Sequence, residues 1–188
     1  MSNDSTTGGY LSPAGSPAPI DDTALEDVFQ QMVVGLTGLP GSLVRPMWQS
    51  VVPMVPEPTV NWCALGMTVT DGDANPVSTH DPNANSGQGG ETLQRHETIE
   101  LLCSFYGPQA QQLATILRDG LYLGQNNSAL QLYYGIGLKS ADSALGVPEL
   151  INQQWQRRYD LKIRFRRQVI RSYPIYNLLS APFQIQKG

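Results

Sequence analysis

Alternating apolar and polar residues mark three segments of the chain as β-strands. In Tyr159–Pro174 the apolar positions 159, 161, 163 and 165 alternate with charged ones, so one face of this strand is apolar and the other is basic. Two earlier segments, VNWCALGMTVTD (60–71) and ETLQRHETIELLCSFYG (91–107), alternate in the same way. The inward-facing residues of these two segments are predicted to be Cys63, Leu65, Met67, Val69, Ile99, Leu101, Cys103 and Phe105. The segment IGLKSADS (136–143) predicts a further short strand.

The alternation breaks late in the basic segment. Arg166 and Arg167 are adjacent, and Val169 and Ile170 follow them. Two basic residues in a row cannot both face solvent on a regular strand. We therefore predict a bulge or bend at this point.

Helical periodicity appears in three other segments. Residues 21–36 predict a helix, with Asp22 or Thr23 as its N-cap. A second helix is predicted to begin at Gly107–Pro108 and to end near Gly120, and a short third one covers 125–135, capped by Asn127 or Ser128. The apolar stripes of the first two consist of Leu25, Val28, Phe29, Met32 and Val33, and of Leu113, Ile116 and Leu117.

Two segments show neither the alternation of a strand nor the periodicity of a helix. Residues 1–20 are rich in Ser, Gly and Pro and are predicted to form a flexible, extended N-terminal arm. Residues 71–90 are predicted to form a long polar loop, of a length that is unusual unless it is functional. The order of the remaining elements predicts an α+β fold over a single domain, 21–188. Its sheet should be mixed and largely antiparallel, with helices packed on one side.

Charge is distributed unevenly along the chain. Residues 157–171 contain seven of the twelve Lys and Arg and one acid, a charge of +6, whereas the rest has five bases and fifteen acids, a charge of −10. Such segregation favours contact between opposite surfaces of neighbouring copies, or steering of a charged partner. A solvated basic strand face is the simpler interpretation.

Residue patterns that carry catalysis are missing from the sequence. YGIGLKS (134–140) fails the phosphate-loop spacing, because Leu138 separates Gly137 from Lys139. Cys63 and Cys103 have no zinc-ligand spacing with the two histidines and are predicted to be buried free thiols. We therefore expect no enzyme activity, no cofactor and no metal. The polar N-terminus and the lack of long apolar runs predict no signal peptide and no membrane partner.

Four segments are informative when taken together: GLPGSLVRPMWQ, QRHETIELLCSFYGPQA, LRDGLYLGQNNSALQ and WQRRYDLKIRFRRQVIRSYPIYNLLSAP. In this order they resemble the phage neck terminator family of tailed bacteriophages and prophages. The resemblance covers about Leu39 to Pro182, and its most specific parts are CSFYGP and YPIYNLLSA. It implies a virion protein, made in the cytoplasm of the host bacterium, that forms a ring of usually six copies on the tail tube. The ring would end tube polymerisation and bind the tail-tube protein and the head-side connector or stopper. The resemblance brings no enzymatic residues.

This resemblance suggests a role for the basic strand. In a ring, the basic face of one copy could pair with acidic residues of the next, while Arg164 and Arg166 could alternatively face the lumen and contact genome DNA. The segment IYNLLSAPF (175–183) would supply apolar contacts. The candidate interface or lumen charges are Lys162, Arg164, Arg166, Arg167, Arg171, Glu97 and Glu100.

Other functions fit the same sequence. A different head–tail joining component, such as a head-completion or stopper protein, would share the neck location. A sequence-independent DNA-contacting protein would use the basic strand on phosphates, although its aromatic residues face inward rather than toward bases. An enzyme with an unrecognised site is the remaining alternative.

Overall fold

The computed structural model describes residues 3–14, 18–49, 51, 53–151 and 153–180. They divide into two compact units. The larger unit contains residues 20–72 and 96–168, and the smaller one contains the described residues of 1–19, 73–95 and 169–188. Strands β4 (Gly90–Tyr106) and β9 (Arg158–Tyr173) contribute residues to both units.

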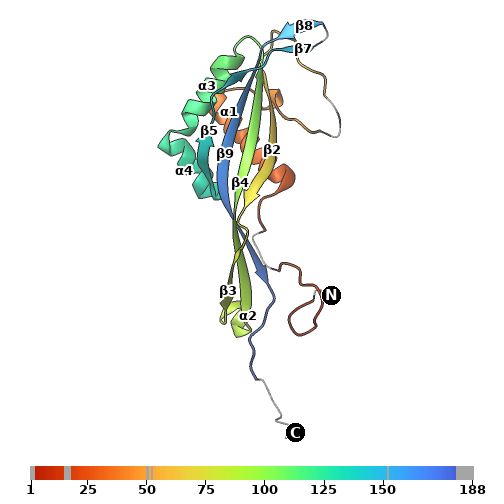
Figure 1. Cartoon of the computed structure of the whole chain (residues 1–188), viewed down its shortest axis with the longest axis vertical. Helices are drawn as coiled ribbons and strands as arrows, with labels where there is room; N and C mark the ends of the chain where they lie inside the picture. Colours follow the sequence, from red (N-terminus) through yellow and green to blue (C-terminus); the bar gives the residue numbers. More distant parts are fainter. Residues whose placement is uncertain (1–2, 15–17, 50, 52, 152, 181–188) are drawn as a thin grey trace. The chain divides into compact units, whose positions relative to one another are not determined.

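The larger unit is built on a mixed, largely antiparallel sheet (Figure 1). Its central strand order is β1-β2-β4-β9-β5, in which β1 (Val44–Pro46) runs parallel to β2 (Trp62–Gly72). Antiparallel pairs join β2 to β4 and β9 to both β5 (Ile136–Ala141) and β6 (Leu145–Gly146). A separate hairpin pairs β7 (Glu149–Ile151) with β8 (Gln154–Gln156).

Three helices cover the apolar face of this sheet and close the core. They are α1 (Asp22–Thr37), α3 (Ala110–Leu121) and α4 (Gly124–Tyr134), and a short 3-10 turn, η1 (Gly41–Leu43), precedes β1. Phe29 of α1 packs on Phe165 of β9, with ring centroids 5.1 Å apart. The α+β fold is therefore confirmed.

Most predicted inward faces are buried. The whole stripe of α1 is buried, and so are the predicted inward residues of β4, together with Cys63 and Leu65 of β2. Met67 is half-buried at the edge of the core, and the side chain of Val69 lies outside the described residues. Ile116 was wrongly assigned to the core, since it is 40% exposed. The small residues Ala110 and Ala114 instead complete the stripe of α3 and let this helix lie close to its neighbours.

The predicted helix caps are wrong. The N-cap position of α1 is Asp21, and its side chain makes no capping hydrogen bond. Helix α4 begins at Gly124, three residues before Asn127, whose side-chain oxygen instead accepts a hydrogen bond from the Leu138 N–H at 3.1 Å. The Asn127 side chain is thus held by a tertiary contact with Leu138 and does not cap the helix.

The predicted bulge in β9 is also absent from its described residues. Burial alternates through the strand without a break, so that Arg167 occupies an inward position between Phe165 and Val169. The irregularity lies in the partner strand instead, where the register of β5 shifts between Leu138 and Ser140. Because Arg167 has ionic partners on the inward side, the strand does not need to turn it out to solvent.

The smaller unit corrects the prediction of a 71–90 loop. Residues 77–81 form β3 (Val77–Asp81), which pairs with the start of β4, and the turn between them contains α2 (Ala84–Gly87). Every residue of β3 is exposed, so no hydrophobic alternation announces this strand. The N-terminal arm also makes ordered contacts, because Ser5 and Ala14 donate backbone hydrogen bonds to Pro174 and Ser172. Within the described part of the chain, no helix has the length and apolar character needed to cross a membrane.

Candidate interaction site

Strand β9 presents its basic residues on two different faces. The alternation places Lys162, Arg164 and Arg166 on the outer face of the sheet and Arg167 on the inner face. Lys162 and Arg166 are exposed, Arg164 is half-buried and Arg167 is buried. Arg171 is half-buried and belongs to the smaller unit. One basic strand therefore contains residues in very different environments.

On the outer face, Arg164 lies between two carboxylates of its own chain. Its guanidinium contacts Glu100 at 3.1 Å and Asp142 at 3.3 Å, and Lys162 Nζ lies 3.8 Å from Glu100. These side chains are between 22% and 53% exposed, so each pair contributes at most about 1 kcal/mol. The pairs nevertheless neutralise much of the positive charge at this position.

A second ionic group surrounds the start of β9. Arg158 donates two hydrogen bonds to Asp160, at 2.8 and 3.0 Å, and contacts Glu149 at 3.1 Å. Its guanidinium also lies 5.7 Å from the centroid of the Tyr106 ring, which stacks on Trp62. The hydrogen bonds to Asp160 raise the pKa of Arg158, while burial raises the pKa of Tyr106 to about 12. Arg158 is therefore paired with two carboxylates and lies over the ring of Tyr106.

The inner face contains the most buried charge. Arg167 is 8% exposed and donates to Glu97 Oε2 from Nε at 3.1 Å and from Nη2 at 2.9 Å. Its Nη2 also lies 2.7 Å from Asp21 Oδ1, and its Nη1 donates to the Ile20 carbonyl oxygen. Arg167 thus joins β4, β9 and the beginning of α1. Buried charges persist in proteins only when they are paired in this way.

Most of the predicted interface charges therefore have partners within their own chain. Glu97 pairs with Arg167, and Glu100 pairs with Arg164 and Lys162. Within the described residues, the exposed Arg166 side chain has no ion-pair partner that offsets its charge. The predicted contact of these charges with a neighbouring copy or with DNA stays a prediction.

Sequence reasoning missed the acidic partners Asp21, Asp142 and Asp160. Asp21 was assigned to the start of a helix, and Asp142 directly follows β5, a short strand whose pairing was not predicted. Asp160 carried a usable signal, since it lies two positions from Arg158 on the same strand face, where opposite charges can pair.

The chemistry available from the remaining titratable groups is limited. Cys63 and Cys103 are buried free thiols. Burial raises the pKa of the Cys63 thiol, which lies next to the Cys103 side chain. A raised pKa disfavours the reactive thiolate. Among the described residues, no group of three or more His, Cys, Asp or Glu side chains could hold a metal ion.

Large apolar side chains are exposed on several elements. Trp48, Met54 and Trp155 are 65%, 89% and 73% exposed, and Leu178 and Leu179 reach 83% and 92%. The last two belong to the predicted apolar segment 175–183, of which residues 181–183 lie outside the described residues. Leu178 and Leu179 are adjacent in the chain and are therefore candidates for contact with a partner.

Comparison with known protein families identifies a match. Residues 23–188 match the family model described as the phage neck terminator protein. The match begins sixteen positions before the segment in which the resemblance was recognised, and it confirms that resemblance. It leaves the whole Ser/Gly/Pro-rich arm, residues 1–20, outside the family model. No curated protein matches the chain.

Proposed function

The chain belongs to the phage neck terminator family, and on this premise we propose that it forms a ring that ends tail-tube polymerisation and joins the tail to the head connector. The observation that carries the proposal is the family match over residues 23–188. The family is one of structural phage neck proteins, which makes the chain a virion component. Six copies in the ring, the tail-tube protein and the head-side connector or stopper are the finer parts of the proposal.

The described surface supports assembly through apolar contacts. Exposed tryptophans and leucines lie on several parts of the chain, as noted above, and are available for contacts with other proteins. By contrast, Lys162 and Arg164 already have carboxylate partners in their own chain. In this proposal the ring is therefore held mainly by apolar surface, and the charges of β9 set orientation.

The exposed Arg166 has two roles open to it in such a ring. It can meet an acidic surface of the neighbouring copy, or it can face the lumen and contact the phosphates of the passing DNA. Both follow from an exposed guanidinium whose charge no described acidic side chain balances. The first role affects ring formation, whereas the second affects only DNA retention in finished particles.

Native mass spectrometry of the purified full chain, alone and mixed with the tail-tube protein, tests the proposal. We expect a hexamer, either in solution or formed when the tube end is added. A chain that remains monomeric and does not bind the tube contradicts the terminator role. Binding to the head-side connector without any binding to the tube would instead indicate a head-completion or stopper protein.

A further inference from the structure

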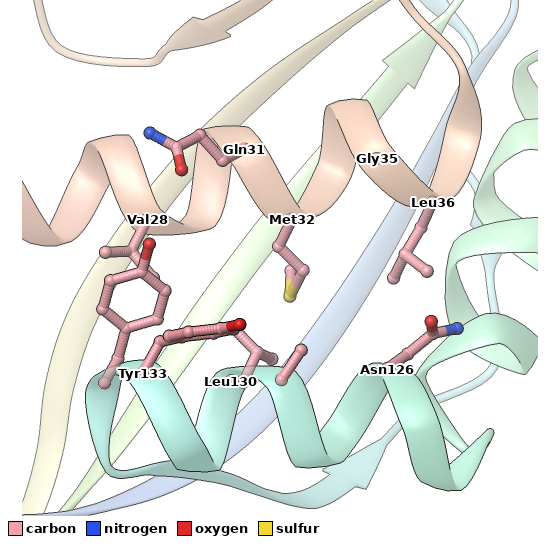
Figure 2. Close-up of a pocket in the computed structure, with 10 residues that line it drawn as sticks. Val28, Gln31, Met32, Gly35, Leu36, Asn126, Leu130 and Tyr133 are labelled. Atoms are coloured by element: carbon pink, nitrogen blue, oxygen red, sulfur yellow. The ribbon is translucent and has the colours of Figure 1, made fainter.

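A groove runs between helices α1 and α4 on the larger unit (Figure 2). Val28, Met32 and Leu36 line it from α1, and Leu130 and Tyr133 line it from α4. Its volume is about 280 Å³. The residues that line the groove are all uncharged. In the figure the Gln31 side chain points away from α4, and Asn126 lies at one end of the groove.

Gly35 leaves one wall of the groove open. Gly35 is one of the residues of α1 that line the groove, and a Cβ atom built on it meets nothing within 4 Å. Gly35 lies in the last turn of α1, and glycine is a weaker helix former than alanine. Its presence here is understandable if the space above it is needed for something other than this chain's own packing.

The smaller unit presents exposed apolar side chains next to a well-anchored residue. Asn177 is held firmly, because its side-chain nitrogen donates to the carbonyl oxygens of Pro82 and Gly87 at 3.0 Å and its backbone N–H donates to Gln88. His80 lies 2.8 Å from the Asn177 side-chain oxygen. The two residues that follow, Leu178 and Leu179, are 83% and 92% exposed. A firmly anchored residue thus presents two leucines to solvent.

We propose that the α1/α4 groove of one copy binds Leu178 and Leu179 of a neighbouring copy. The inference rests on the proposed ring function, and it names the contact that would hold the ring. An anchored segment on one surface and a groove on another make a head-to-tail contact, which closes into a ring when the rotation between copies allows it. A self-complementary patch would give a dimer instead.

The chemistry of the two surfaces favours a second copy as the occupant. Residues 174–180, PIYNLLS, contain no charged side chain, and the groove contains none either. A charged ligand would therefore lose its hydration without gaining a partner in the groove. A cavity of about 150 Å³ is large enough for a benzene ring, so 280 Å³ has room for the ends of two leucine side chains.

Two matched pairs of variants test the contact. Leu178→Asp/Leu179→Asp changes only exposed residues, and we expect it to weaken association between copies by more than about a hundredfold, since two buried leucines are lost. Leu132→Asp is its control, because Leu132 is 82% exposed on α4 but does not line the groove. Gly35→Phe fills the groove from the other side, and Gly124→Phe places the same ring in open space outside it.

The measurement is the fraction of rings against protein concentration, with a thermal melt to confirm folding. The inference requires Leu178→Asp/Leu179→Asp and Gly35→Phe to lose rings while both controls keep them. Rings that survive either of these two variants overturn the inference but leave the proposed function standing. A wild-type chain that remains monomeric with and without the tail-tube protein overturns both.

Cross-linking shows which copy supplies the segment. A Gly35→Cys chain is mixed with a Leu179→Cys chain under mild oxidation, while the native cysteines stay protected by burial. We expect a cross-linked species of twice the chain mass in the mixture and none from either variant alone. If a double variant instead forms the bond within a single chain at high dilution, the segment binds its own groove and the inference fails.

Discussion

Replacing Arg167 by methionine should destabilise the fold far more than the same change at its neighbour Arg166. The two residues are adjacent on β9, but one is buried on the inner face and the other is exposed on the outer face. Methionine keeps most of the aliphatic volume and removes the charge in both cases. The comparison therefore isolates the effect of the buried ionic group.

The expected magnitude follows from the partners that are left behind. Removing Arg167 leaves the Glu97 carboxylate, whose side chain is 19% exposed, and the Ile20 carbonyl oxygen without a donor. Breaking a buried pair in this way costs about 3–5 kcal/mol. Since Asp21 is 39% exposed and can be rehydrated, we expect about 3 kcal/mol. For a chain of this length, that lowers the melting temperature by roughly 6–12 °C.

Urea denaturation and thermal melting of wild type, Arg167→Met and Arg166→Met give the required free energies of unfolding. Arg166→Met should stay within about 0.5 kcal/mol of wild type. The double variant Arg167→Met/Glu97→Gln should recover part of the loss, because the uncompensated carboxylate is then neutral. Equal free energies of unfolding for the two single variants would refute the assignment of Arg167 as a buried structural charge.

Three other outcomes follow from individual residues. Burial raises the pKa of Tyr106 from 10.0 to about 12, so between these pH values the folded chain keeps a proton that the unfolded chain loses. The free energy of unfolding should therefore fall between pH 10 and 12, by up to about 1.4 kcal/mol per pH unit. Urea unfolding at pH 9 and 11 should show a smaller drop for Tyr106→Phe. Gly107→Ala should lower the free energy of unfolding by more than about 2 kcal/mol, because Gly107 has a φ of +101° and a Cβ atom on it would lie 2.5 Å from the Val60 carbonyl oxygen. Gly124→Ala, where a Cβ atom meets nothing within 4 Å, should not lower it. Arg166→Glu should leave the melting temperature unchanged and reduce either the ring fraction in native mass spectrometry or the DNA retention of finished particles. If neither changes, Arg166 is only a solvated residue.

The parts of the fold that bury apolar side chains could be predicted from the sequence. Burial on one face forces a period of two on β4 and of nearly four on α1, and these periods are visible in the residues themselves. Strand β3 could not be predicted, because it is held by backbone pairing to β4 and buries no side chain. Ile116 was misassigned because alanines, which carry little hydrophobic signal, occupy the true inner stripe of α3.

The candidate site was only half visible in the sequence. The basic strand and its acidic surroundings could be recognised from charge counts, but the pairing could not. Glu97 and Asp21 lie 70 and 146 residues away from Arg167, so their contact with it depends on the completed fold. In the sequence, two adjacent arginines, Arg166 and Arg167, suggest an irregular strand more readily than a regular strand with one arginine buried. The acidic partners of Arg167, which only the fold reveals, show that the regular strand is correct.

The internal pairing of these charges also predicts how a ring should respond to salt. Screening shortens the range of exposed charge interactions from about 10 Å at 0.1 M to 3 Å at 1 M ionic strength. Because Glu100 and Asp142 already balance Lys162 and Arg164 within the chain, few strong charge contacts remain for a neighbouring copy. Sedimentation velocity between 0.1 and 1 M NaCl should therefore show a nearly constant ring fraction. Rings that dissociate steeply across this range would contradict apolar assembly and would assign the contact to the basic strand instead.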